Sequence, residues 1–232
     1  MMNYKFANKV FKIESLYDSF SIYANEYITN EQEDYVINIQ QEHIDNWLND
    51  HPEDNAYTRD YIETLVIHKI VAEILSDFNT YIIHGSAVSI DNEGYIFIAP
   101  SGVGKSTHVR LLKGKLNNRL VYVNDDKPFI DNNFNLYGSP WDGKERLSNN
   151  IKTSLKGIFI LNRGIVPSFE KLSSLEATQL LYQAIYIVNE EQALDYVIKL
   201  ASLFPVYRIN VNMDSESIEQ TIKLMEKIKY ES

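Results

Sequence analysis

The chain has 232 residues, of which 44% are hydrophobic, and a formal net charge of −10. These values predict a globular protein built as one large domain, or as one domain with a small unit attached. The chain contains no cysteine, which excludes disulfides, thiolate metal sites and cysteine nucleophiles.

The sequence carries no clear targeting or membrane signal. Every apolar run is much shorter than the roughly 18 residues of a membrane-spanning helix, and the first residues lack the apolar stretch of a signal peptide. We therefore expect a cytoplasmic protein that does not bind a membrane. An oligomer is compatible with the sequence.

The net charge is concentrated in the first third of the chain. Residues 1–80 contain 15 acidic and 5 basic residues, whereas residues 81–232 contain 17 of each. This asymmetry predicts two structural units and argues against nucleic acid as a partner of the first unit. A solvated acidic surface explains the charge more simply than an acidic docking site.

Three short strands and a helix are predicted in the first unit. The strands are Lys9–Ile13, Phe20–Tyr23 and Tyr35–Ile39, each with apolar or aromatic residues at strand spacing. After a polar break at 49–55, a broad apolar face from Arg59 to Leu75 predicts the helix. Residues 1–79 are thus expected to form a small strand-rich unit with one helix.

Strands and helices are interspersed through the remainder, residues 80–232. The predicted strands are Tyr81–His84, Ala87–Ile90, Tyr95–Ile98, Leu120–Val123, short segments around Phe129 and Leu136, Gly157–Leu161 and Val206–Val211. One predicted helix begins at Lys105, and three others cover Leu175–Val188, Glu190–Leu203 and Ser215–Lys229. This pattern favours an α/β core with a mixed sheet.

A phosphate-binding turn is predicted between the strand Tyr95–Ile98 and the helix that follows. It reads A-P-S-G-V-G-K-S from Ala99 to Ser106 and departs from the Walker A pattern only where Ala99 replaces the first glycine. In such a turn, backbone N–H groups and a helix N-terminus face the phosphates, while the lysine reaches the β- and γ-phosphates. An ordinary glycine-containing turn is the alternative. The expected nucleotide ligands are Ser101, Gly102, Val103, Gly104, Lys105, Ser106 and Thr107.

Two adjacent carboxylates follow the strand Leu120–Val123. Asp125 and Asp126 lie about twenty residues beyond Lys105, at the kind of strand end where a P-loop enzyme holds Mg²⁺. Paired acids repel one another unless a cation lies between them. We expect one of them to bind Mg²⁺ together with Ser106, and the other to accept the proton of an attacking hydroxyl. A turn that caps the next segment is the alternative.

Three further candidates are less specific. His84, before Gly85, is either a site residue or a hydrogen-bonded structural histidine. The loop Gly138–Glu145 offers Lys144 for phosphoryl charge and Glu145 for the metal, or else forms a surface turn with its tryptophan packed inward. Arg163, beyond a buried strand, is a candidate for phosphate contact.

Several of these segments together resemble the HPr kinase/phosphorylase-like proteins over about residues 80–211. They are Ile83–Val88, the Walker turn, the acidic pair and the loop Ser139–Trp141. The resemblance implies a P-loop fold akin to phosphoenolpyruvate carboxykinase. It assigns catalytic roles to His84, Lys105, Asp125 and Asp126, and it implies transfer of the γ-phosphoryl group of ATP to a serine hydroxyl of a protein or peptide.

Two departures from this family concern the substrate. Ser106-Thr107 stands where the bifunctional enzymes usually carry Ser-Glu, and their later glycine-rich signature has no counterpart. The loop Pro140–Gly143 is more similar to divergent members that phosphorylate precursor peptides. We therefore expect an ATP- and Mg²⁺-dependent serine kinase of this divergent kind. A non-catalytic ATP-binding module and a small-molecule kinase remain alternatives.

Overall fold

The computed structural model describes residues 1–212 and 214–231. The first unit contains a three-stranded sheet in the order β1-β2-β3, with β1 antiparallel and β3 parallel to β2. Its strands are β1 (Met2–Phe6), β2 (Lys9–Glu14) and β3 (Tyr35–Asn38). Its helices are α1 (Ser19–Tyr23), α2 (Gln41–Asp50) and α3 (Arg59–Ser76), with short 3-10 turns at Asn25–Tyr27 and Pro52–Ala56.

The prediction of a strand at Phe20–Tyr23 is wrong, because this segment lies in helix α1. Four residues are too few to separate a period of 2.0 from one of 3.6. Phe20 is buried and packs against the rings of Tyr4 and Trp141, so a single tertiary anchor fixes this short turn of helix.

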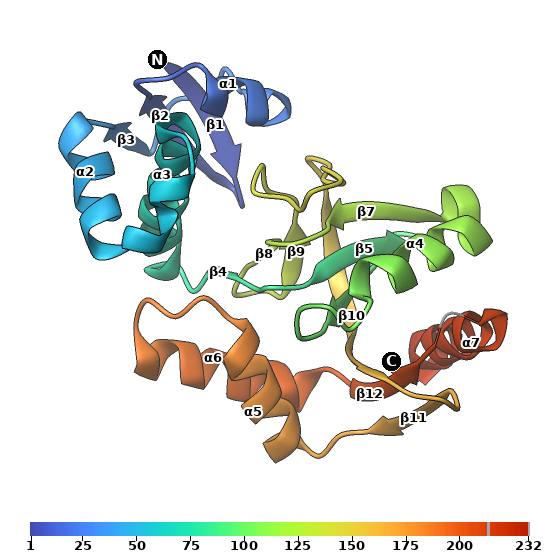
Figure 1. Ribbon diagram of the computed structural model, residues 1–232. Helices are drawn as coiled ribbons and strands as arrows, with labels where there is room; N and C mark the ends of the chain where they lie inside the picture. The colour runs from blue at the N-terminus through green and yellow to red at the C-terminus, as the bar shows by residue number, and fades with distance from the viewer. Residues whose placement is uncertain (213, 232) are drawn as a thin grey trace.

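The second unit contains a nine-stranded mixed sheet, which confirms the predicted α/β class (Figure 1). Its strands are β4 (Tyr81–Ile82), β5 (Ser86–Ile90), β6 (Glu93–Ile98), β7 (Leu120–Asn124), β8 (Phe129–Ile130), β9 (Asn135–Tyr137), β10 (Lys152–Arg163), β11 (Ser168–Lys171) and β12 (Val206–Val211). Its helices are α4 (Lys105–Leu116), α5 (Ser174–Ala184), α6 (Glu190–Leu203) and α7 (Ser215–Glu231), with a 3-10 turn at Asn117–Arg119.

The strand order around the centre of this sheet is β12-β10-β6-β5-β7. Strand β10 runs parallel to both β6 and β12, and β5 runs antiparallel to β6 and β7. The loop after β6 therefore lies between the ends of β12 and β10 on one side and the end of β7 on the other.

The alternation of apolar residues along β6 gives the sheet two buried faces. Ile96 and Ile98 belong to a core that α5 and α6 cover. Tyr95 and Phe97 belong to a second core, which α4 and α7 cover. With both faces covered, the sheet gives a rigid support to the loops at its edge.

A third core joins the two units. It contains the apolar faces of β1, β2 and α3 together with Phe129, Tyr137 and Trp141 from the second unit. The division of the chain into domains at residues 1–79 and 80–232 stays a prediction. Among the described residues, no helix is both long enough and apolar enough to cross a membrane.

Candidate functional site

The loop between β6 and α4 has the backbone that a phosphate-binding turn requires. Gly102 and Gly104 have φ values of +79° and +109°, a region that residues with a side chain rarely adopt. Gly104 is the N-cap of α4, so the first N–H groups of this 12-residue helix face the loop. Ala99 is not among the residues with positive φ, so alanine fits where the Walker pattern has glycine.

The Lys105 side chain extends from the first turn of α4 to the ends of β5 and β7. Its ammonium donates hydrogen bonds to Ser86 Oγ and to the Asp125 carbonyl oxygen, each at 3.0 Å. Burial lowers the pKa of Lys105, and the carboxylates of Asp126 and Asp125 oppose this shift. The sequence predicted the role of Lys105 but gave no role to Ser86, whose hydroxyl also donates to the Asp125 carbonyl at 2.8 Å.

The acidic pair follows β7 directly, and an asparagine organises the turn. Asn124 Oδ1 accepts hydrogen bonds from the backbone N–H groups of Asp126 and Lys127, at 2.8 and 2.6 Å. The Asn124 amide donates to the Ser139 carbonyl and hydroxyl, each at 3.0 Å, which ties the turn to the loop Gly138–Glu145. Asn124 thus makes the turn, and both aspartate side chains remain for other contacts.

The two carboxylates lie in different surroundings. Asp125 is buried, and its Oδ1 accepts a hydrogen bond of 2.6 Å from the backbone N–H of Gly143. Asp126 is partly exposed; its Oδ1 lies 3.2 Å from His84 Nε2 and its Oδ2 lies 3.7 Å from Lys127 Nζ. Asp126 thus has a histidine and a lysine beside it and a path to solvent.

The pKa of Asp126 lies below its usual value. Burial acts to raise it, but the hydrogen bond to His84 and the charges of Lys127, His84 and Lys105 outweigh burial. Asp126 is therefore ionised near neutral pH, as an acceptor of a proton or as a ligand of a cation must be.

The loop Gly138–Glu145 lies between the acidic pair and the first unit. Gly143, Lys144 and Glu145 line the same depression as the P-loop, and Glu145 Oε1 lies 3.8 Å from a guanidinium nitrogen of Arg110 on α4. Trp141 points away from the depression. Its ring is buried and its Nε1 donates to the Thr64 carbonyl at 2.9 Å, so it packs inward as the alternative prediction had it.

Arg163, at the end of β10, binds the P-loop backbone. Its Nη2 donates to the Gly102 carbonyl at 2.6 Å and its Nε to the Val103 carbonyl at 3.2 Å. Its side chain therefore holds the loop in shape, whereas the sequence suggested a contact with phosphate.

An open depression with a volume of about 600 Å³ brings together all but one of the predicted site residues. They are His84, Ser101, Gly102, Gly104, Lys105, Ser106, Thr107, Asp125, Asp126, Lys144, Glu145 and Arg163. Val103 lies in a neighbouring pocket. No group of three or more His, Asp or Glu side chains suited to a metal occurs in the part of the chain that the structure describes. Mg²⁺ in phosphoryl-transfer sites needs only one or two carboxylates besides the phosphates.

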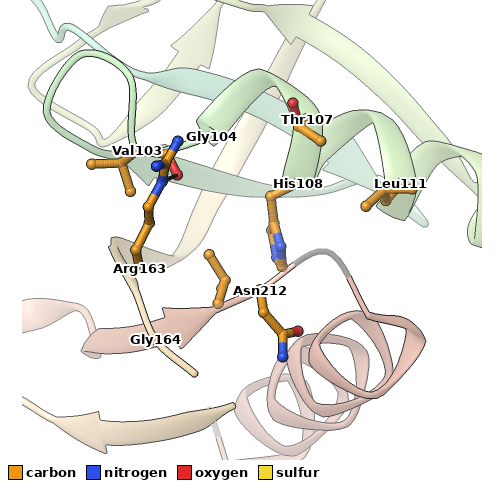
Figure 2. A pocket seen from close by; sticks show the side chains of 9 residues that line it. Val103, Gly104, Thr107, His108, Leu111, Arg163, Gly164 and Asn212 are labelled. Carbon is orange, nitrogen blue, oxygen red and sulfur yellow. Dashed lines mark hydrogen bonds between the residues drawn. The ribbon is translucent and has the colours of Figure 1, made fainter. Parts of the chain in front are cut away.

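The neighbouring pocket, of about 240 Å³, shares Gly104, Thr107 and Arg163 with the depression. Figure 2 shows Val103, His108 and Leu111 from the P-loop and α4 above it, with Arg163 and Asn212 from the ends of β10 and β12. Sequence analysis missed this pocket, because its walls come from three segments that are distant along the chain.

His108 gives this pocket an uncharged wall. Burial lowers the pKa of His108 to about 4. Its Nε2 lies 3.1 Å from Thr221 Oγ1, which itself donates to the Ser217 carbonyl, so Nε2 must carry the proton. The other ring nitrogen, Nδ1, has no partner within the described residues.

The likenesses of this chain to known proteins are distant ones, to solved structures. No protein-family model and no curated protein matches the chain. Among solved structures, the HPr(Ser) kinase/phosphatase from Coxiella burnetii matches with 12% identity and a TM-score of 0.37, over 65% of this chain and 91% of that chain. Because this likeness is weak, the function proposed below rests on the residues of the site.

Proposed function

We propose that this protein is a kinase that uses ATP and Mg²⁺ and transfers the γ-phosphoryl group to a serine hydroxyl of a protein or peptide. One observation carries the proposal. The glycine-shaped turn before α4, Lys105 and the two carboxylates after β7 all line one depression. Phosphoryl transfer is catalysed mainly by positioning and by charge neutralisation, and these groups can supply both.

The triphosphate would bind at the N-terminus of α4. The N–H groups of residues 101–106 and the positive end of the helix dipole attract anions. Lys105 already lies at the base of the depression, where burial makes its charge costly. A phosphate close to its ammonium would offset that cost.

Asp125 and Ser106 are the proposed holders of Mg²⁺, with Glu145, which lines the same depression, as a further ligand. A bound Mg²⁺ would neutralise charge on the phosphates as the reaction proceeds. Oxygen donors of this kind suit a hard cation.

Asp126 is the proposed general base. The serine oxygen forms a bond to the γ-phosphorus, the bond from that phosphorus to the β,γ-bridging oxygen breaks, and ADP leaves. The serine proton passes to the Asp126 carboxylate. His84, 3.2 Å away, holds this carboxylate in position and lowers its pKa.

The base of the nucleotide would occupy the pocket of Figure 2. This pocket adjoins the P-loop on the side of β10 and β12, whereas the acidic pair lies on the side of β7. An extended nucleotide with its γ-phosphate at the acidic pair has its base on the opposite side. The apolar side chains of Val103, Leu111 and Val211 and the uncharged His108 suit a planar base.

Transfer from γ-labelled ATP to a peptide library with one serine per peptide tests the proposal. We expect Mg²⁺-dependent labelling of serine that Lys105→Ala abolishes and that Lys115→Ala leaves unchanged, since Lys115 forms a surface ion pair with Glu219. Asp125→Asn should weaken Mg²⁺-ATP binding, and Asp126→Asn should mainly lower the rate. ATP binding without any labelled product would contradict the kinase assignment and favour a binding module. If neither aspartate change lowers transfer at least tenfold, a barrier change of about 1.4 kcal/mol, the roles given to the pair are wrong.

A further inference from the structure

A second pocket adjoins the acidic pair on the side that faces the first unit. Its walls come from α1, α3 and two segments of the second unit, and its lining residues are Phe20, Tyr23, Tyr61, Thr64, Leu65, Lys127, Pro140, Trp141 and Asp142. We call it the aromatic pocket. It touches the site at two places, because Lys127 follows Asp126 and Asp142 precedes Gly143 along the chain.

The position of the aromatic pocket relative to the proposed nucleotide follows from the strand order. A nucleotide in the proposed orientation runs from the ends of β12 and β10 towards the end of β7. In-line transfer requires the acceptor to approach the γ-phosphorus from the side opposite ADP. Beyond Asp126, the next side chain is Lys127, which lines the aromatic pocket. The acceptor therefore reaches the site past this pocket.

The lining of the pocket favours an apolar group of modest size. Four of its walls are aromatic rings, and its volume is about 50 Å³. One water needs at least about 10–15 Å³ on the same measure, so the pocket has room for about three or four heavy atoms. That is the size of an aliphatic side chain and is too small for a nucleotide base with its sugar.

The walls are held in place by contacts that do not involve a ligand. Trp141 is fixed by its hydrogen bond to the Thr64 carbonyl and by the edge of the His68 ring, 5.0 Å away. The guanidinium of Arg146 lies 4.0 Å from the centre of the Tyr23 ring. A preformed pocket of this kind binds a side chain with little cost of reorganisation.

Exposed apolar residues continue from the aromatic pocket, because the His68 ring lies 5.0 Å from the ring of Trp141 and 5.9 Å from that of Tyr186. Tyr186, Ile187 and Val188 follow α5 and are each about 37–41% exposed. The His84 N–H donates to the Ala184 carbonyl at 2.7 Å and the Tyr186 N–H to the Ile82 carbonyl at 2.9 Å, which fixes this segment beside His84. An extended segment that passes the aromatic pocket would thus meet further apolar contacts at Tyr186 and the residues after it.

We propose that the aromatic pocket binds an aliphatic side chain of a peptide acceptor, close in sequence to the serine that is phosphorylated. The inference rests on the proposed kinase function. A peptide is favoured as the occupant because exposed apolar residues continue from the pocket through Tyr186 to Val188, as an extended chain with several side chains needs.

The test uses a serine-centred peptide library in which each flanking position carries Leu, Phe, Lys, Asp or Ala, with γ-labelled ATP and the full chain. We expect labelling to favour Leu over Ala at one flanking position by at least tenfold. Tyr61→Ala, which removes a wall, and Leu65→Trp, which fills the pocket, should reduce this preference to less than threefold. The matched control is Tyr57→Ala, because the Tyr57 ring contacts that of Tyr61 but does not line the pocket.

Two further measurements separate the possible failures. ATP hydrolysis in the absence of peptide should be the same in all four proteins, and thermal unfolding should show that the variants are folded. Labelled peptides without a preference for Leu, or a preference that survives both variants, would overturn the inference while leaving the kinase function in place. If no peptide is labelled but a small hydroxylated compound is, the peptide acceptor of both proposals is wrong.

Discussion

Gly143 leaves no room for a side chain beside the Asp125 carboxylate. A Cβ atom at this position would lie 2.7 Å from Asp125 Oδ2 and 3.1 Å from its Cγ, closer than such atoms approach in folded proteins. Because the Gly143 N–H also binds Asp125 Oδ1, the carboxylate must move if residue 143 gains a methyl group. We expect Gly143→Ala to lower the rate of phosphoryl transfer at least tenfold and to raise the Mg²⁺ concentration needed for half-maximal rate.

Gly114 provides the matched control for this change. It lies within α4, and a Cβ there would meet nothing within 4 Å. Gly114→Ala should keep full activity and add about 0.5–1 kcal/mol of stability, since alanine is favoured over glycine inside a helix. Equal rates for the two variants would argue against a role of the Asp125 carboxylate in transfer.

Asp142 makes stability depend on pH. Burial raises the pKa of Asp142 to about 6, and the nearby charge of Asp125 adds to the shift, although the Ser148 hydroxyl opposes it. Between the usual carboxyl pKa and about 6, the folded chain holds a proton that the unfolded chain has lost. Stability therefore falls as pH rises through this window. Asp142→Asn cannot ionise, so its melting temperature should exceed that of the unmodified chain at pH 8.

The difference in melting temperature between Asp142→Asn and the unmodified chain should nearly vanish in acid. At pH 4, Asp142 is protonated in the folded state and about half protonated in the unfolded state, so most of the effect is lost and the two proteins should melt within about 1 °C of one another. At pH 8 we expect a difference of about 2–4 °C, the shift that about 1 kcal/mol produces in a chain of this size. A difference that is constant from pH 4 to pH 8 would show that the carboxyl is not perturbed.

Helix α4 contributes to both the depression and the pocket of Figure 2. Its N-terminus faces the depression, and Leu111, two turns further on, lines the pocket of Figure 2. We expect Leu111→Trp to fill that pocket and to weaken ATP binding at least tenfold, while Mg²⁺-tripolyphosphate, which has no base, binds as before. Leu194→Trp on α6 is the control, because Leu194 is similarly exposed and lies outside the pocket. Titration calorimetry measures both ligands, and equal weakening of both would contradict the base pocket.

Most elements with several buried apolar residues could be predicted from the sequence, even the short strands β8 and β9, and those with few buried residues could not. The strand predicted at Tyr95–Ile98 is observed at Glu93–Ile98, and the helix after the turn begins at Lys105 as predicted. Helix α2 was missed because Ile44 is its only fully buried residue, and β11 was missed because none of its side chains is buried. Each of these elements is fixed by contacts with distant parts of the chain and not by its own periodicity.

The same distinction applies to the site. Lys105, Asp125 and Asp126 could be found because each follows a buried strand in a recognisable order. The hydrogen bonds of Ser86 and Asn124 could not, because they join strands that meet only in the folded sheet. The hydrogen bonds of Arg163 to carbonyls 60 and 61 positions away along the chain could not be found either, and its contact with phosphate stays a prediction.

The two units of the molecule are joined around Trp141. Its ring centre lies 5.3 Å from that of Phe6 in β1, 5.9 Å from Phe20 in α1 and 6.2 Å from Phe129 in β8. One residue of the second unit thus fills the space between both sheets. Because the same side chain is a wall of the aromatic pocket, the packing of the units and the proposed binding of the acceptor depend on it together.

Trp141→Ala should therefore destabilise the whole molecule and not one unit alone. We expect a loss of about 3–5 kcal/mol, the usual effect of removing a large buried aromatic side chain, measured by urea unfolding followed by far-ultraviolet circular dichroism. Trp141→Phe keeps an aromatic ring but loses the hydrogen bond to the Thr64 carbonyl. The lost hydrogen bond should cost about 1 kcal/mol of stability in addition to the effect of the smaller side chain.

Trp47→Ala serves as the control: Trp47 stacks on His51 and donates to Asp54 at one end of the first unit. If the Trp47 and Trp141 alanine variants lose the same stability, the contact between the units contributes no more than a peripheral one. A smaller loss in Trp141→Ala, confined to part of the unfolding transition, would mean that the two units unfold independently.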